Sequence, residues 1–106
     1  MVKGIFDRHP NLKIIIGHLG EIFAFWTWRI DHRFKRERTL ETLAYEKYIS
    51  EYLKQNFYVT TSGYYDTPSL QHCIAKIGIE RVILSVDYPY EDSVETSQWL
   101  DSIPYS

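Results

Sequence analysis

The chain has 106 residues, of which 44% are hydrophobic and 25% are charged, so one folded domain of ordinary composition is expected. Its formal net charge of -2 provides no basic surface for a nucleic-acid backbone. No apolar run approaches the roughly 20 residues of a membrane-spanning helix, and the first residues lack a secretory signal. Cys73 is the only cysteine, which excludes an internal disulfide and favours a reducing, cytoplasmic compartment. We therefore expect neither a nucleic acid nor a membrane as partner.

The first third of the chain contains helical and strand patterns in turn. Residues 2–6 have apolar side chains at helical spacing. Residues 12–17 form a short β-branched run, and such nearly continuous apolar runs predict a strand that is covered on both faces. Residues 21–34 then predict an amphipathic helix. Its apolar stripe consists of Ile22, Trp26, Ile30 and Phe34.

The rest of the chain repeats this order. Residues 39–54 carry a weaker helical stripe, and residues 56–62 are rich in strand-forming side chains. Thr67 is a candidate N-cap for a helix that ends at Gly78, where a left-handed backbone is expected. The buried face of that helix should comprise Leu70, Cys73, Ile74 and Ile77.

A third apolar strand is predicted over residues 81–87, and a last helix should begin near Ser93. Strands and helices that alternate in this way indicate an α/β fold with parallel strands and right-handed crossovers. A barrel of eight such units takes about 250 residues. The 106 residues supply three units, so we predict that they form part of a (β/α)₈ TIM barrel that is incomplete.

Polar residues follow the predicted strands, where functional groups of parallel α/β proteins gather. His18 and Glu21 lie in the segment Gly17-His18-Leu19-Gly20-Glu21, directly after the first strand. His18 is read either as a functional residue or as a hydrogen-bonded structural one. Glu21 is read either as a functional residue or as a stabiliser of the helix dipole in a first helical turn.

Two further strand ends carry polar side chains. Asp87 ends the third strand, and a carboxylate there needs a metal, a cation or several donors unless it caps the next turn. Residues 60–65 place hydroxyl groups after the middle strand, but they match no nucleophile motif. We interpret that segment as the wall of a pocket.

Taken together, four motifs resemble the amidohydrolase-related metal-dependent decarboxylases, and within them the γ-resorcylate and 2,3-dihydroxybenzoate decarboxylase branch. The resemblance extends from residue 4 to about residue 100. It implies that residues 1–106 are a partial amidohydrolase-like domain comprising the three C-terminal βα units of the barrel. The motifs are Gly17-His18-Leu19-Gly20-Glu21, Arg29-Ile30-Asp31, residues 56–63 and residues 85–91.

The resemblance also implies roles for individual residues. Asp87 matches the family's metal ligand and proton donor, and His18 matches its acid–base histidine. Glu21 matches the acidic partner of that histidine. Arg29 matches an arginine that meets the substrate, often from a neighbouring subunit. A divalent metal is therefore expected, with zinc favoured over manganese, together with a small aromatic acid substrate and a homo-oligomer.

The departures from the family concern the metal. The first-strand His-x-His or Glu-x-His pair and the middle-strand histidine are absent, and His9, His32 and His72 do not replace them. A catalytic zinc needs about three protein ligands, so the chain alone should be inactive. The expected reaction of the parent enzyme is nonoxidative decarboxylation of a hydroxylated aromatic acid. Two alternatives remain: a metal-dependent hydrolase of a lactone or ester, and a non-catalytic truncated product.

Overall fold

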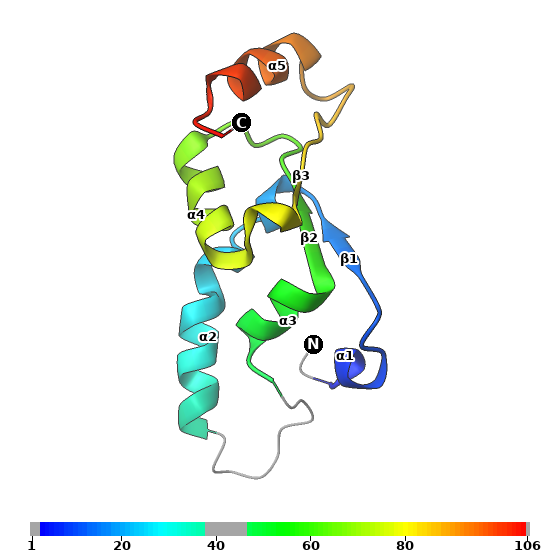
Figure 1. Ribbon diagram of the computed structural model, residues 1–106, viewed down its shortest axis with the longest axis vertical. Helices are drawn as coiled ribbons and strands as arrows, with labels where there is room; N and C mark the ends of the chain where they lie inside the picture. Colours follow the sequence, from blue (N-terminus) through cyan, green and yellow to red (C-terminus); the bar gives the residue numbers. More distant parts are fainter. Residues whose placement is uncertain (1–2, 38–46, 106) are drawn as a thin grey trace.

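The computed structural model describes residues 3–37 and 47–105 and has the expected α/β alternation (Figure 1). In chain order the elements are α1 (Ile5–Arg8), β1 (Ile14–Ile16), the 3-10 turn η1 (His18–Gly20), α2 (Phe23–Glu37), α3 (Ile49–Asn56), β2 (Phe57–Thr60), α4 (Thr67–Ile77), the 3-10 turn η3 (Ile79–Arg81), β3 (Val82–Ile83) and α5 (Ser93–Ser102). Part of the helix predicted over residues 39–54, and Val2 of the first helical pattern, lie outside the described residues. None of the described helices is both long and apolar enough to cross a membrane.

The three strands form one parallel sheet in the order β1-β2-β3, which confirms the predicted direction of the strands. Ile14 pairs with Phe57 across β1 and β2, and Val59 pairs with Val82 across β2 and β3. The regular strands are shorter than predicted, and β3 keeps only two residues. Because β2 is central, the segments that follow β1 and β3 lie on either side of the segment that follows β2.

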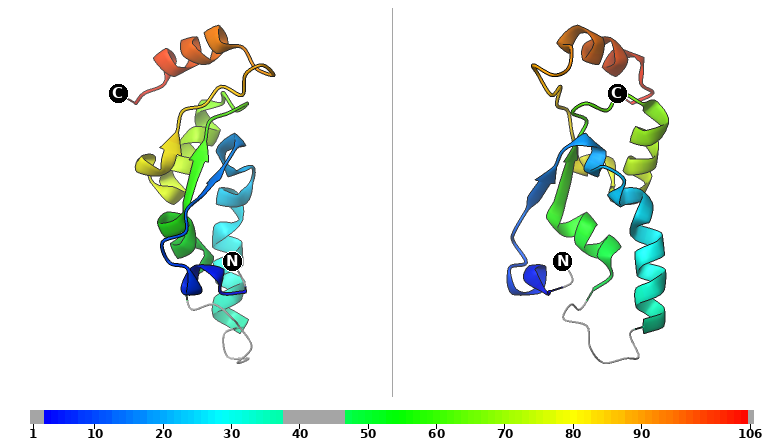
Figure 2. Two further views of the ribbon diagram at one scale, coloured as in Figure 1. Left: turned by 90° about the vertical axis from the view of Figure 1, so that its right-hand side faces the viewer. Right: turned by 180° about the vertical axis from the view of Figure 1, so that it is seen from behind.

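The helices α2, α3 and α4 pack on one face of this sheet (Figures 1 and 2). The side chains of Phe57 and Val59 point into that layer and are buried, whereas Tyr58 and Thr60 alternate with them on the other face. The expected buried face of α4 is present, with Leu70, Cys73 and Ile77 buried and Ile74 packed against the core. The buried core thus lies between the sheet and the helices.

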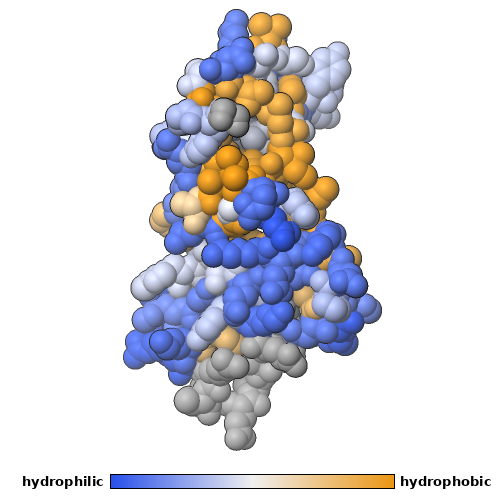
Figure 3. All heavy atoms as spheres, in the orientation of Figure 1, coloured by the Kyte–Doolittle hydropathy of each residue, from blue (hydrophilic) through white to orange (hydrophobic). Residues whose placement is uncertain are grey.

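The opposite face is open, as expected where three strands stand without the other strands of a barrel, so the apolar side chains on that face are exposed in the chain as described. The Ile15 side chain is 61% exposed, and Leu84, just after β3, is 50% exposed. Figure 3 views the β3 edge of the sheet, where apolar atoms also gather over the region of η3, β3 and α5. The apolar stripe predicted over residues 21–34 is also only partly buried, because Phe34 is buried while Ile22 and Trp26 are half exposed.

Two predicted helix starts need correction. The N-cap of α4 is Asp66 and not Thr67, because the Asp66 carboxylate accepts a hydrogen bond from the Ser69 backbone at 3.0 Å. Glu21 does not lie in the first turn of α2: it ends η1 with a φ of 54°, and α2 begins at Phe23. Stabilisation of a helix dipole is therefore not the reason for an acidic residue at this position.

Candidate active site

The site is built where the two outer strands end. β1 is followed by Gly17 and by the turn η1, which carries His18. β3 continues without regular pairing to Asp87, whose backbone carbonyl then accepts a hydrogen bond from Tyr90 in the next turn. The two side chains meet across the end of β2, with 3.2 Å between His18 Nε2 and Asp87 Oδ2. The convergence expected from parallel strands is therefore present.

A second carboxylate lies on the other side of the imidazole. His18 Nδ1 is 3.3 Å from Glu21 Oε1, so each ring nitrogen faces a carboxylate. The tautomer of the ring decides which carboxylate receives an N–H. The side chains of His18 and Asp87 are 44% and 35% exposed, and that of Glu21 is 67% exposed. The pair is therefore accessible from solvent, and such a chain of groups can orient an imidazole and pass a proton.

The backbone of the site is strained. His18, Glu21 and Asp87 have φ values of 53°, 54° and 77°, in the left-handed region that side-chain-bearing residues rarely adopt. Such conformations persist only where the surroundings fix them, and they concentrate at functional sites. All three residues that the sequence singled out as catalytic share this feature.

The remaining candidates lie away from the pair. Arg29 is exposed on α2, about two helical turns beyond Glu21, and within residues 3–37 and 47–105 no hydrogen bond or ion pair joins it to the site. His9 ends α1, and His32 and His72 lie in α2 and α4, as expected. No group of three or more His, Cys, Asp or Glu side chains that could hold a metal occurs among the described residues.

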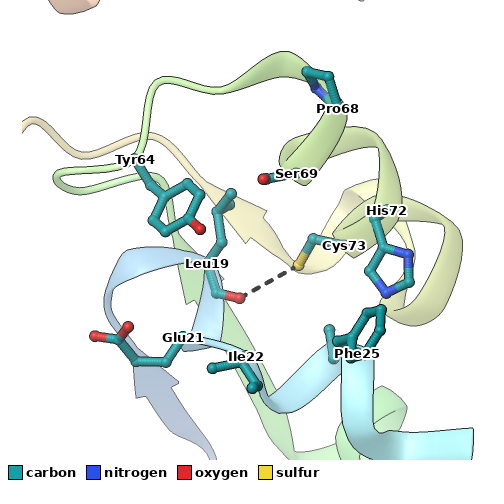
Figure 4. A pocket seen from close by; sticks show the side chains of 10 residues that line it. Leu19, Glu21, Ile22, Phe25, Tyr64, Pro68, Ser69, His72 and Cys73 are labelled. Carbon is teal, nitrogen blue, oxygen red and sulfur yellow. Dashed lines mark hydrogen bonds between the residues drawn. The ribbon is translucent and has the colours of Figure 1, made fainter.

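A pocket of about 430 Å³ adjoins the site on the side of Glu21, between the starts of α2 and α4 (Figure 4). Phe25 and His72 form one wall, and Tyr64 lies opposite, after β2. Burial raises the pKa of the Cys73 thiol in this pocket to about 11. Neither His18 nor Asp87 lines the pocket, so the pair lies outside it.

No pattern in the sequence predicts that the segment after β2 contacts His18. The backbone N–H of His18 donates to Ser62 Oγ at 3.2 Å, and Gly63 lies against both His18 and Asp87. The available signal was a glycine that follows hydroxyl side chains at a central strand end. That pattern indicates a close approach of the backbone without saying to what.

A parallel α/β unit with an imidazole–carboxylate pair at its strand ends is typical of the metal-dependent barrel enzymes. The profile of the amidohydrolase family matches residues 1–104, and the chain belongs to that family.

Its relatives are decarboxylases. The chain is 39% identical over 106 residues to a γ-resorcylate decarboxylase of Polaromonas sp. strain JS666, covering 100% of this chain and 32% of that protein. A dihydroxybenzoic acid decarboxylase of the same strain, solved with manganese and the inhibitor 2-nitroresorcinol, matches with a TM-score of 0.90 and 38% identity over 98% of this chain and 31% of its own. A 2,6-dihydroxybenzoate decarboxylase complexed with 2,6-dihydroxybenzoate matches with a TM-score of 0.91 and 36% identity over 100% and 33%. The chain thus spans about a third of the length of these relatives.

Proposed function

We propose that the protein carrying this chain is a metal-dependent decarboxylase that removes CO₂ from a hydroxylated aromatic acid without oxidation. The chain would supply the three C-terminal βα units of the barrel. The observation that carries the proposal is the His18–Asp87 pair, joined at 3.2 Å between two strand ends, in a chain 39% identical to a γ-resorcylate decarboxylase. Dihydroxybenzoates of the kind bound by the solved relatives are the proposed substrates.

In the proposed reaction, Asp87 donates a proton to the ring carbon that bears the carboxylate. The bond between that carbon and the carboxylate then breaks, its electron pair restores the aromatic ring, and CO₂ leaves. His18 stabilises the charge that develops at the neighbouring hydroxyl oxygen. Glu21 faces the other ring nitrogen of His18 at 3.3 Å and so orients the imidazole. Asp87 recovers its proton from solvent, to which its side chain is 35% exposed.

Asp87 also fits one place in a divalent metal site. Its Oδ2 faces His18, whereas no hydrogen bond to Oδ1 is found in the described part of the chain, which leaves a carboxylate oxygen for a cation. A bound divalent cation would supply positive charge that holds the carboxylate and ortho-hydroxyl oxygens of the substrate. Manganese is the metal in the Polaromonas structure. Zinc remains a prediction, and both metals should be compared.

We propose further that Arg29 binds the substrate carboxylate of a neighbouring subunit. It lies on a surface of α2 that exposes Phe25, Trp26 and Trp28 by more than half of each side chain. Large exposed aromatic groups around an arginine are typical of protein–protein interfaces. A homo-oligomer would cover this surface. A monomer in light scattering of the full-length protein would contradict this part of the proposal.

The experiment is a product analysis. Full-length protein loaded separately with Mn²⁺ and Zn²⁺ is incubated with 2,6-dihydroxybenzoate, and CO₂ and resorcinol are quantified together with the metal content. Equal amounts of CO₂ and resorcinol, dependent on metal, are expected. Metal-loaded protein that releases no CO₂ from dihydroxybenzoates but opens a lactone would support the hydrolase alternative and contradict the proposal.

A further inference from the structure

The segment Thr61–Gly63 follows the central strand β2 and lies between the segments that carry His18 and Asp87. We propose that this segment is a positioning device that holds His18 against Asp87. Its consequence for catalysis rests on the function proposed above, whereas its structural part does not.

Ser62 fixes the side of His18. Its Oγ accepts a hydrogen bond from the His18 backbone N–H at 3.2 Å and lies 2.8 Å from Thr60 Oγ1. Ser62 is buried, so the bond is shielded from water. A Cβ at Gly17 would lie 3.3 Å from the same Oγ, so the close approach of the two segments depends on glycine there. Through this bond to the backbone N–H, Ser62 holds the left-handed backbone of His18 in place and with it the attached imidazole.

Thr61 fixes the side of Asp87. Its Oγ1 donates to the backbone carbonyl of Ser85 at 2.9 Å and accepts from the Ser85 N–H at 3.0 Å. The strand β3 has already ended at Ile83, so these bonds replace the missing strand pairing. Thr61 is 4% exposed, and loss of its hydroxyl would leave both backbone groups of Ser85 without this partner. Asp87 follows two residues after Ser85, so Thr61 holds the backbone close to Asp87.

Gly63, the last residue of the segment, lies close to both His18 and Asp87. Its backbone N–H donates to the Val86 carbonyl at 3.4 Å, and its φ is 64°. A Cβ at this position would lie 3.1 Å from His18 Cδ2 and 3.2 Å from Asp87 Oδ2. Gly63 therefore leaves too little room for a side chain, which would press against both partners of the pair.

These contacts explain how strained residues keep one geometry. His18 and Asp87 both have left-handed backbones, which relax unless neighbouring groups hold them. Each residue or its immediate neighbour is hydrogen-bonded to the same short segment that follows β2. A shift of about 1 Å in a catalytic pair can cost a hundred-fold in rate, so the segment should affect kcat more than substrate binding.

The test compares isosteric and conservative variants of the full-length protein. Thr61→Val keeps the shape and removes the hydroxyl, whereas Thr61→Ser keeps the hydroxyl. We expect Thr61→Val to lower kcat for 2,6-dihydroxybenzoate by roughly ten-fold to a hundred-fold with KM within about two-fold, and Thr61→Ser to recover most of kcat. Gly63→Ala should have an effect like that of Thr61→Val. Gly4→Ala, at another left-handed glycine far from the pair, is the matched control and should leave kcat unchanged.

Crystal structures of the same variants give a readout that does not depend on the reaction. The distance between His18 Nε2 and Asp87 Oδ2 should stay near 3.2 Å in Thr61→Ser and exceed hydrogen-bond length in Thr61→Val and Gly63→Ala. If the wild type has no decarboxylase activity, the proposed function fails, and these distances still decide the positioning role. An unchanged pair in Gly63→Ala and in folded Thr61→Val would overturn the inference, as would a loss expressed in KM alone. If Thr61→Val does not fold, Gly63→Ala decides.

Discussion

The two carboxylates beside His18 allow a direct comparison of chemical roles. Asp87→Asn and Glu21→Gln each replace a carboxylate by an amide of the same shape, at 3.2 Å and 3.3 Å from the same imidazole. Glu21 is 67% exposed, and ion pairs this exposed are worth roughly 1 kcal/mol at most, or about five-fold in rate. A residue that donates the proton contributes about 10² or more, which is about 2.7 kcal/mol. Asp87→Asn should therefore lower kcat by at least ~10², and Glu21→Gln by less than about ten-fold.

The assay is steady-state kinetics on 2,6-dihydroxybenzoate, with the metal content of each variant measured in the same samples. The metal content matters because loss of a metal ligand and loss of a proton donor both lower kcat. If Asp87→Asn retains its metal and wild-type kcat, Asp87 is structural and the proposed mechanism is wrong. If the two variants lose the same amount with metal bound, Asp87 acts only through its charge on His18.

Three further predictions concern stability and reactivity. Because burial raises the pKa of Cys73 to about 11, its thiol should react with a disulfide reagent at pH 8 only after unfolding; rapid labelling of folded protein would contradict this. Asn56 is buried and donates hydrogen bonds to two backbone carbonyls at 3.0 and 2.8 Å. Asn56→Ala should therefore lower the free energy of unfolding by about 2–3 kcal/mol in a urea titration. A loss below about 0.5 kcal/mol would show that these bonds are dispensable. Hydrogen bonds from the side chain and the backbone of Ser69 lower the pKa of Asp66 below 3.8, so this cap stabilises the fold above that pH and loses its effect as the pH falls through the lowered pKa. The difference in Tm between wild type and Asp66→Ala should therefore shrink in acid, and a constant difference would argue against the cap.

The parallel sheet and the meeting of His18 with Asp87 could be predicted, because both depend on a strong local pattern and one topological rule. Apolar runs mark the strands, and parallel strands bring their carboxyl ends to the same edge. The exposure of Ile15 does not follow from the apolar pattern of its strand, since it depends on how many strands are present to cover the second face of the sheet. The start of α4 failed for a local reason: Asp66 and Thr67 are adjacent and both are cap residues, so only the backbone geometry distinguishes them.

The supporting contacts of the site were beyond sequence reasoning. Glutamate seldom adopts a left-handed backbone, so nothing in the sequence predicted one at Glu21, and a helical first turn was expected there instead. The bond from His18 to Ser62 joins residues 44 positions apart, and no periodicity reports it. Only the glycine at position 63 gave a signal, because a glycine after a strand end indicates that something approaches the backbone closely.

The His18–Asp87 pair joins positions 69 apart in the chain, and a whole strand is inserted between its partners in space. Helices such as α2 and α4 can form within microseconds from local contacts, whereas parallel pairing requires the closure of long loops and is slow. During refolding the helical circular-dichroism signal should therefore return before the pair does. A chain that is already helical but has not yet seated β2 between its neighbours has no site, so recovery of the pair reports the completion of tertiary structure.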